Sequence, residues 1–330
     1  MKVGKVSQTV LKRYMLKPLQ FQREEALFSP SAEEMCYGIE QKEGEQLLCS
    51  NTVLYGDEKD LTVFALAHVV NDLATRGAKA VGAAIHIMLP TYAYESRLKA
   101  MMEYAEAAGS AHGVQILSAK AEVCPVLQST VVYVNGVGVA KKGEVLTSSM
   151  AKPGQDIVLL KWIGLEGTFR ILRAREEALE KRFVPGFLQQ IRDMEKEIFS
   201  EKEIAFAKES GVSAMHQIGE GGILAALWEL CEASGVGMEV ELRKMSIRQE
   251  TVELCEFFRL NPYQLTSAGS VLMVTDNGEE LAERFRQTGV TGVVLGRTTK
   301  DTARTILGGE EKRFLDRPAP DEWLKLYETT

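Results

Sequence analysis

The sequence lacks the signals of several large protein classes. Its five cysteines include no Cys-x-x-Cys pair, and its four histidines show no zinc-binding spacing. This pattern is typical of reduced thiols, so we expect a cytoplasmic protein. The net charge is -7, and the basic residues are scattered among acidic ones rather than gathered in a stripe. Because phosphate backbones attract concentrated positive charge, we expect no nucleic-acid partner.

Long hydrophobic runs are missing as well. The longest, Ala80–Leu89, is interrupted by His86 and closed by Pro90, well short of the roughly 20 residues that span a bilayer. The first residues lead into a polar segment and not into the apolar region of a signal peptide. We therefore expect no membrane association.

Neither common nucleotide-binding fingerprint is complete. Gly-x-x-x-x-Gly-Lys-Ser/Thr is absent, and Gly136-Val137-Gly138 lacks the third glycine of a dinucleotide-binding turn. Gly219-Glu220-Gly221-Gly222 precedes an apolar helical pattern, where exposed N–H groups are a natural anion site. Taken alone, such a run more often permits close packing at a helix start. Both interpretations stay open at this point.

The chain is long enough for two hydrophobic cores, with 330 residues of which 45% are hydrophobic. Turn-rich segments at Lys141–Glu144 and Lys152–Gln155 place a boundary near residue 150, giving domains 1–150 and 151–330. Strands and helices interleave in the first domain, which predicts a mixed α/β sheet with helices packed on it. The second domain follows an α+β pattern.

Several elements are expected from periodicity and turn signals. In the first half they are a helix after Ser7, a hairpin of Met35–Glu40 with Gln46–Asn51, a strand at Val81–Met88, a helix at Tyr94–Gly113 with Tyr104 inward, and strands at Val114–Ser118 and Ser129–Ala140. In the second half they include helices at Thr168–Lys181, Ile223–Ala233 and Glu279–Gln287, and strands at Asp156–Lys161, Val236–Leu242, Ser270–Thr275 and Val290–Gly296.

The helix that ends near Gly77 carries the most informative polar pattern. One face repeats apolar residues at three-and-four spacing, and the opposite face stacks His68, Asp72 and Arg76 on successive turns. One interpretation is a solvated face with an Asp72–Arg76 ion pair. The other takes Asn71 and Asp72 as an amide and an acid that line a nucleotide cleft. The family resemblance below favours the second.

Several motifs, in order along nearly the whole chain, resemble the AIR synthetase (PurM) superfamily. These motifs are Asn71-Asp72-Leu73-Ala74 with Gly77-Ala78, the helix opened by Gly221-Gly222, and Ala233-Ser234-Gly235-Val236-Gly237. Further motifs are similar to its hydrogenase maturation branch, HypE, namely Ile247-Arg248-Gln249-Glu250-Thr251, Leu260-Asn261-Pro262 and Gly308-Gly309.

The resemblance implies a PurM-like two-domain fold. Its N-terminal α/β domain binds ATP and forms a barrel with a second subunit, and its C-terminal domain is α+β. It also implies a homodimer with ATP and Mg²⁺ as cofactors, and other maturation proteins as candidate partners. Members phosphorylate an oxygen of a substrate so that it can leave. In HypE the substrate is a carbamoyl group on the protein's own C-terminal cysteine, which is dehydrated to a thiocyanate.

The departures from the family pattern lie mainly at the predicted Mg²⁺ site. Carried over by motif, the metal positions are Glu34, Asn51 and Asp72, and the nucleotide positions are Asn71, Asp72, Lys120, Gly221 and Gly222. Asn51 stands where the family has an aspartate, and Lys120 stands where it has an acid or imidazole. Mg²⁺ requires hard oxygen ligands, so these changes weaken its site. No residue after Cys255 is a cysteine, so the tail cannot carry a carbamoyl group.

Three functions follow from these features. The first is a HypE-like, ATP-dependent protein that activates a substrate oxygen, with a degenerate metal–nucleotide site and no terminal thiol. The second is a non-catalytic binding or regulatory paralogue of HypE. The third is AIR synthetase of purine biosynthesis, which suits the fold but not the altered loops.

Overall fold

A computed structural model describes residues 2–33, 36–309 and 311–328. The chain forms two compact units. Unit 1 comprises Met1–Ala74 with Ala78–Val145, and unit 2 comprises Thr75–Gly77 with Leu146–Thr330. Within the described residues, no helix is both long and apolar enough to cross a membrane.

Unit 1 is built on a five-stranded sheet in the order β1-β4-β3-β5-β2. The strands are β1 (Gly4–Lys5), β2 (Glu45–Gly56), β3 (Lys79–Leu89), β4 (Gln115–Val123) and β5 (Thr130–Lys141). Only the β3–β4 pair is parallel, because a helical crossover connects these two strands. The mixed α/β fold class is confirmed. The sheet is open within one chain, with β1 and β2 at its edges, so a barrel would need a second subunit.

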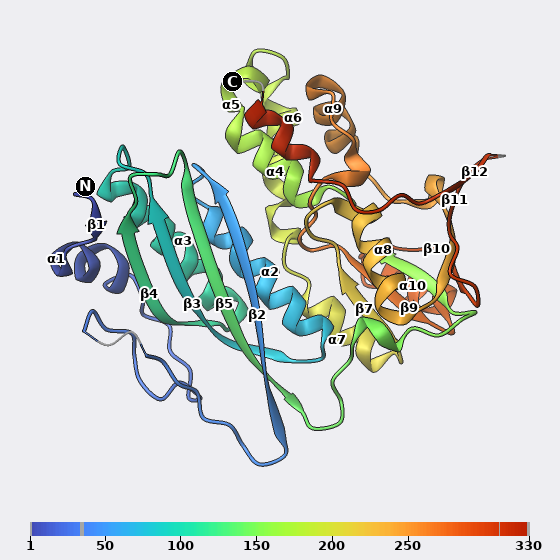
Figure 1. Cartoon of the computed structure of the whole chain (residues 1–330), viewed down its shortest axis with the longest axis horizontal. Helices are drawn as coiled ribbons and strands as arrows, with labels where there is room; N and C mark the ends of the chain where they lie inside the picture. The colour runs from blue at the N-terminus through green and yellow to red at the C-terminus, as the bar shows by residue number, and fades with distance from the viewer. Residues whose placement is uncertain (1, 34–35, 310, 329–330) are drawn as a thin grey trace. The chain divides into compact units, whose positions relative to one another are not determined.

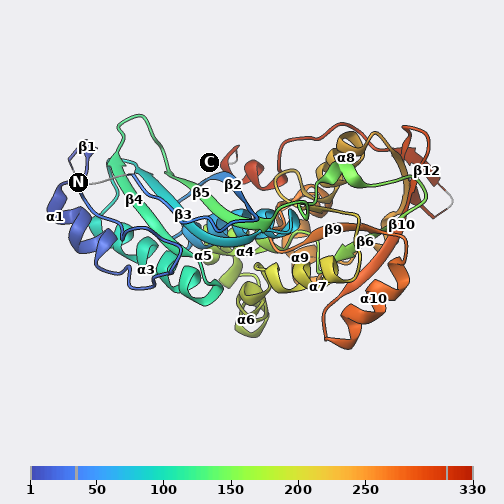
Figure 2. The same cartoon turned by 90° about the horizontal axis from the view of Figure 1, so that it is seen from below.

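Helices α2 (Leu61–Thr75) and α3 (Glu95–His112) cover one face of this sheet, as Figures 1 and 2 show. Helix α2 buries Phe64, Leu66 and Leu73, and Gly77 follows it with a φ of 75° that glycine adopts without strain. Near the N-terminus, Ser7 caps α1 (Gln8–Val10), which continues as the π-helical turn η1 (Leu11–Leu16). The other face of the sheet carries no helix of unit 1.

Two expectations for unit 1 are wrong. Strand β2 does not form a hairpin with the segment before it, because all twelve of its residues pair with β5, from Glu45 opposite Lys141 to Gly56 opposite Thr130. Met35, at the start of the expected hairpin, lies outside the described residues. Tyr104, expected to point inward from α3, is 45% exposed. The predicted helices and central strands otherwise form within a few residues of their expected ends.

Unit 2 contains a seven-stranded sheet in the order β12-β11-β8-β10-β6-β9-β7. Its strands are β6 (Asp156–Leu160), β7 (Ala214–Gln217), β8 (Gly237–Glu241), β9 (Val271–Thr275), β10 (Gly292–Thr299), β11 (Arg304–Gly308) and β12 (Glu311–Phe314). The sequence patterns indicated β6, β8, β9 and β10. They did not indicate β7, β11 and β12, which are only four or five residues long and lie toward the sheet edges.

Helices surround this second sheet. They are α4 (Leu165–Ala174), α5 (Glu176–Glu180), α6 (Pro185–Asp193), α7 (Glu201–Glu209), α8 (Gly222–Ser234), α9 (Gln249–Phe258), α10 (Gly278–Gln287) and α11 (Lys325–Glu328). Short 3₁₀ turns are η2 (Ser148–Met150), η3 (Met194–Glu197), η4 (Leu242–Lys244), η5 (Pro262–Gln264) and η6 (Glu322–Leu324). Helix α8 supplies Ile223, Leu227 and Leu230 to the main core.

The C-terminal segment of unit 2 is anchored by polar contacts. Asp321 is 2% exposed, and its two carboxylate oxygens accept N–H groups from Gly221 (2.9 Å) and Trp323 (3.1 Å). The Arg170 guanidinium lies 3.5 Å from the centre of the buried Trp323 ring. Arg175 donates to the Leu326 carbonyl. The segment is therefore part of the folded unit.

Burial raises the pKa of Asp321 from 3.8 to about 7. The Gly221 and Trp323 N–H groups oppose this rise, Glu166 adds to it, and Arg170 opposes it. A carboxyl whose pKa is higher in the folded protein binds a proton more tightly there. Below the pKa of Asp321 in the unfolded state, its burial therefore costs the least stability. Above its pKa in the folded state, where the carboxyl is ionised, burial costs the most stability.

We expect the free energy of unfolding of the wild type, relative to Asp321→Asn, to fall by roughly 2 kcal/mol between pH 5 and pH 8. The asparagine cannot ionise, so the comparison removes the titrations that the two proteins share. Urea unfolding at both pH values measures this difference. Asp316→Asn, which changes an exposed carboxylate of the same segment, is the control. Parallel pH profiles for wild type and Asp321→Asn would contradict the assignment.

Candidate functional site

The polar residues of helix α2 are more buried than a solvated face would be. Asn71 is fully buried, His68 is 9% exposed, and the half-buried Asp72 accepts a 2.7 Å hydrogen bond from the Ser50 hydroxyl through Oδ2. In unit 2, Arg76 donates to Ser148 Oγ at 3.1 Å. The burial of His68 does not fit a fully solvated face, and the expected Asp72–Arg76 ion pair stays a prediction. Asp72 contacts strand β2 through Ser50, and this position is compatible with lining a cleft in unit 1.

Asn51 and Asp72 lie on opposite faces of the sheet. Ser50 is buried and contacts Asp72 on the face that the helices cover. Successive side chains of a strand alternate between faces, so exposed Asn51 points to the uncovered face. A magnesium ion binds its ligands at about 2.1 Å, and these two residues of one chain do not meet such a requirement.

Lys120 shares the uncovered face with Asn51 but stands far across the sheet. The pairing register runs from Lys120 on β4 to His86 on β3, Tyr133 on β5 and Val53 on β2. Asn51 is two residues from Val53, on the same strand and face. Three strand spacings separate β4 from β2, which is about 14 Å. Within one chain, Lys120 therefore does not replace a charge beside Asn51.

The immediate neighbours of Lys120 are His86 and Glu122. Lys120 Nζ lies 3.9 Å from one Glu122 oxygen, and His86 Nε2 lies 3.5 Å from the other. The pKa of His86 is lowered, first by burial and then by the positive charge of Lys120, against the effect of Glu122. With His86 neutral, this group of three carries one positive charge on Lys120 and one negative charge on Glu122, so its formal charge is zero.

The third predicted metal ligand, Glu34, lies outside the described residues. Among the residues that the structure does describe, no group of three or more histidine, cysteine, aspartate or glutamate side chains is arranged to hold a metal ion. The predicted ligands of unit 1 are therefore not brought together around one ion within the described part of that unit.

Gly221 and Gly222 both open helix α8 in the left-handed region, with φ values of 78° and 67°. A side chain at Gly222 would meet the Tyr263 carbonyl at 2.6 Å and the Leu265 nitrogen at 2.7 Å, so only glycine fits there. Close packing thus explains why position 222 is a glycine. The Gly221 N–H donates to Asp321, so a carboxylate of the chain itself occupies the predicted anion position.

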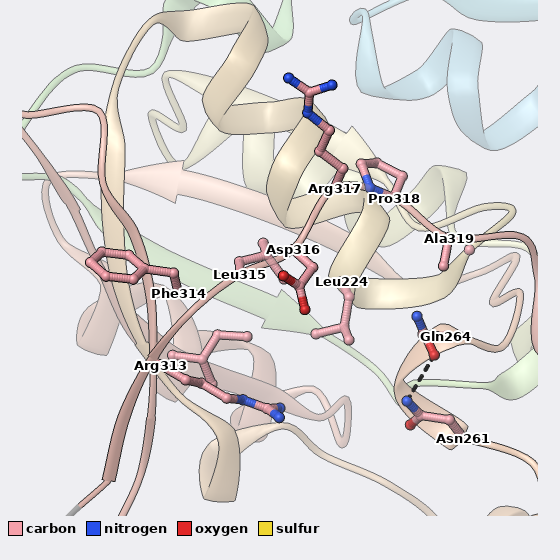
Figure 3. A pocket seen from close by; sticks show the side chains of 12 residues that line it. Leu224, Asn261, Gln264, Arg313, Phe314, Leu315, Asp316, Arg317, Pro318 and Ala319 are labelled. Atoms are coloured by element: carbon pink, nitrogen blue, oxygen red, sulfur yellow. Dashed lines mark hydrogen bonds between the residues drawn. The ribbon is translucent and has the colours of Figure 1, made fainter.

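A cavity of about 210 Å³ lies beside Gly221. Figure 3 shows Arg313 and Asp316 on one side of it, and Asn261 and Gln264 on the other, with the Asn261 amide donating to Gln264 Oε1 at 2.9 Å. Residues 313–319 form one wall, so the C-terminal segment shapes this cavity. Leu224, Ile306 and Leu315 supply its apolar surface.

Sequence reasoning missed Asp321. Its position before Glu322-Trp323 resembles a helix N-cap, and it does cap η6 through the Trp323 N–H. That local signal was available in the sequence. The contact with Gly221, one hundred residues away, was not, because no periodic pattern links a tail residue to a distant helix start.

Comparison with known proteins supports the family assignment. Residues 152–307 match the model of the AIR synthase related protein, C-terminal domain. Carbamoyl dehydratase HypE of Rhodobacter capsulatus is 26% identical over 264 residues, which cover 76% of this chain and 74% of that protein.

Two solved structures share the fold. Hydrogenase maturation protein HypE in complex with ATP aligns with a TM-score of 0.74 at 14% identity, covering 96% of both chains. A chain of the HypE–HypF complex aligns with a TM-score of 0.67 at 20% identity, covering 82% of this chain and 90% of that one. The resemblance seen in the sequence is confirmed: the chain is similar to HypE proteins along most of its length, and its residues 152–307 match the C-terminal domain of AIR synthase related proteins.

Proposed function

We propose that the chain acts in hydrogenase maturation as a HypE-like, nucleotide-dependent protein with an impaired metal site. The similarity to a carbamoyl dehydratase supports the process. The observation that carries the impairment is Lys120, whose ammonium stands where the family has an acid or imidazole and lies 3.9 Å from a Glu122 oxygen. A positive charge repels Mg²⁺ and attracts phosphate, so it changes what the site binds.

The proposed nucleotide contacts are Asn71, Asp72 and Lys120 in unit 1, and Gly221 and Gly222 in unit 2. Lys120 and Asp72 lie on opposite faces of the unit 1 sheet, so within one chain they do not contact the same phosphate. Of the proposed metal ligands within the described residues, Asp72 is the one with a carboxylate, the kind of oxygen ligand that Mg²⁺ prefers, and it accepts a hydrogen bond from Ser50 of β2. Asn51 does not fit the same ion as Asp72 within one chain, since the sheet separates them. We therefore derive no reaction step that passes through a metal.

The proposed chemistry is activation of a substrate oxygen by phosphorylation. We propose an acceptor other than a thiol of residues 256–330, because none of these residues is a cysteine. A carbamoyl group on another molecule would suit this chemistry, and a HypF-like maturation protein is a candidate partner, since HypF binds HypE in a structure of the same fold. A non-catalytic regulatory paralogue is the alternative, and the lost carboxylates favour it. AIR synthetase activity fits the altered loops less well.

We also propose that the chain is a homodimer through the uncovered face of the unit 1 sheet. Leu47 and Val53 on β2 are 48% and 54% exposed, and half-buried Tyr133 and Val131 lie beside them on β5. Strand β2 is also a twelve-residue edge strand, whose outer side pairs with no other strand of the described residues. Natural proteins cover such edges and apolar faces.

Wild-type protein should scatter light as a particle of twice the 36.5 kDa chain mass. Val53→Glu should dissociate it, because a two-fold interface buries the introduced charge twice. Val126→Glu is the matched control, since Val126 is 82% exposed and lies in the turn between β4 and β5. A wild-type monomer at micromolar concentration, or a Val53→Glu dimer, would count against this interface.

Magnesium-dependent ATP binding should be weak in the wild type and about tenfold tighter in Lys120→Asp, because the change removes a charge that repels the ion. Calorimetry with and without magnesium measures both states, and circular dichroism checks folding. Lys99→Asp, at a half-exposed lysine of α3, controls for the change in net charge. Asn51→Asp is tested singly and together with Lys120→Asp. Unaltered or weaker binding in Lys120→Asp would reject this account, and weaker binding would assign the lysine to phosphate.

Catalysis should not pass through a thiol of this chain. Burial raises the pKa of Cys231 to about 11 and that of Cys255 to about 12, which keeps both protonated and unreactive. Protein isolated from cells that are assembling hydrogenase should show no carbamoyl or thiocyanate adduct by mass spectrometry. A HypE that ends in cysteine, treated alike, is the positive control. An adduct on any of the five cysteines, including exposed Cys36 or Cys49, would refute the prediction.

A further inference from the structure

The C-terminal segment makes four separate polar contacts with the body of unit 2. Asp321 accepts the Gly221 N–H, and Glu322 accepts the Asn261 N–H, both at 2.9 Å. Trp323 stacks under Arg170, and the Leu326 carbonyl accepts a hydrogen bond from Arg175. These contacts join the segment to the start of α8, to the loop before η5, and to the middle and the C-terminal cap of α4. The segment is thus held along its length, as a strap would be.

One of these contacts lies where the proposed function needs an anion. The Gly221 N–H stands at the start of the 13-residue helix α8, where the helix dipole favours negative charge. The Asp321 carboxylate, 2% exposed, already accepts that N–H. A phosphate oxygen and this carboxylate cannot occupy the same position. Nucleotide contact at Gly221 therefore requires that Asp321 leaves.

The strap is also suited to release. From α4, Glu166 repels the ionised Asp321 while Arg170 attracts it, and from α8 and η6 the Gly221 and Trp323 N–H groups bind it. Glu322 is the adjacent acid, 7% exposed. The raised pKa shows that burial outweighs these favourable contacts for the charged form. The charged carboxylate thus loses part of its hydration when the strap closes, and regains it on release.

We propose that residues Pro320–Tyr327 form an autoinhibitory strap, in which the Asp321 carboxylate occupies the Gly221 N–H and excludes a nucleotide phosphate from the start of α8. This inference rests on the proposed nucleotide function. Opening the strap exposes Gly221, and ATP binding and strap closure compete.

A purely structural cap would behave differently. If Asp321 only tied the C-terminus down, its loss would lower stability and leave ATP affinity unchanged or reduced. If the strap excludes phosphate, its loss lowers stability and raises affinity. The sign of the change in ATP affinity therefore separates the two roles.

The test compares ATP binding by calorimetry in wild type, Asp321→Ala and Arg175→Ala, with magnesium and with EDTA. Asp321→Ala should bind ATP at least tenfold more tightly than wild type. Arg175→Ala loosens the far end of the strap without touching Gly221, so it should show a smaller gain in the same direction. Glu311→Ala, which removes an exposed acid of β12 outside the cavity lining, should bind as the wild type does. Circular dichroism at the assay temperature confirms that each variant is folded.

Hydrogen exchange of the peptide covering residues 316–327 provides the second measurement. Saturating ATP should increase exchange of this peptide in the wild type, because bound phosphate displaces the strap. Wild-type ATP affinity should also rise from pH 6 to pH 8 relative to Asp321→Ala, since ionisation of the buried carboxyl favours the open form. Protonation of ATP affects the assays of both proteins equally. The difference in pH dependence between wild type and Asp321→Ala therefore reports on Asp321.

The outcomes distinguish the strap from the nucleotide function. Equal ATP binding in wild type and Asp321→Ala, with the 316–327 peptide still protected, would overturn the strap and leave the nucleotide function standing. No ATP binding by any variant would overturn the nucleotide function, and the strap with it. Tighter binding by both Asp321→Ala and Arg175→Ala, with the Glu311→Ala control unchanged, supports both.

Discussion

The two-residue period of strand β2 decides which polar residues of unit 1 can act together. Ser50 points to the helix-covered face and donates to Asp72, while Asn51, its neighbour in the chain, points to the uncovered face. The strand pairing across β5 and β3 shows that Lys120 points to the same uncovered face. A motif alignment places these residues at one family site, but strand geometry divides them into a buried set and a surface set.

That division gives the two sets different tasks. Asp72 and Asn71 are fixed by the packing of α2, so substitutions there act on folding as well as on any ligand. Asn51, Lys120 and His86 stand on a face that also carries exposed Leu47 and Val53, where a second copy of the chain is proposed to pack. A charge on such a face influences both assembly and ligand binding. The oligomeric state of each Lys120 variant must therefore be measured together with its ligand binding.

The sequence predicted those parts of the fold that have strong local patterns. Helix α2, strand β3 and helix α8 follow from apolar periodicity with glycines at their ends, and the structure confirms them. The partner of β2 could not be predicted, because a strand's apolar pattern does not name the strand that it pairs with, and β5 lies about eighty residues further along the chain. Short edge strands such as β12 carry too few residues for a periodic signal.

The site was predicted in part for the same reason. Motif order located Asp72, Gly221 and Gly222, and the structure shows what surrounds each of them. It did not locate Asp321, whose importance comes from one long-range hydrogen bond and from burial beside Glu166 and Arg170. The local sequence does not predict such a long-range contact, although it does show the N-cap pattern of Asp321 before Trp323.

Lys120 and Asp321 alter the charge that a nucleotide would meet in opposite ways. Lys120 adds a positive charge in unit 1, which disfavours a metal ion and favours phosphate. Asp321 adds a negative charge at the start of α8 in unit 2, which disfavours phosphate. The buried carboxylate at Gly221, despite the cost of burying it, fits the proposed control of nucleotide binding.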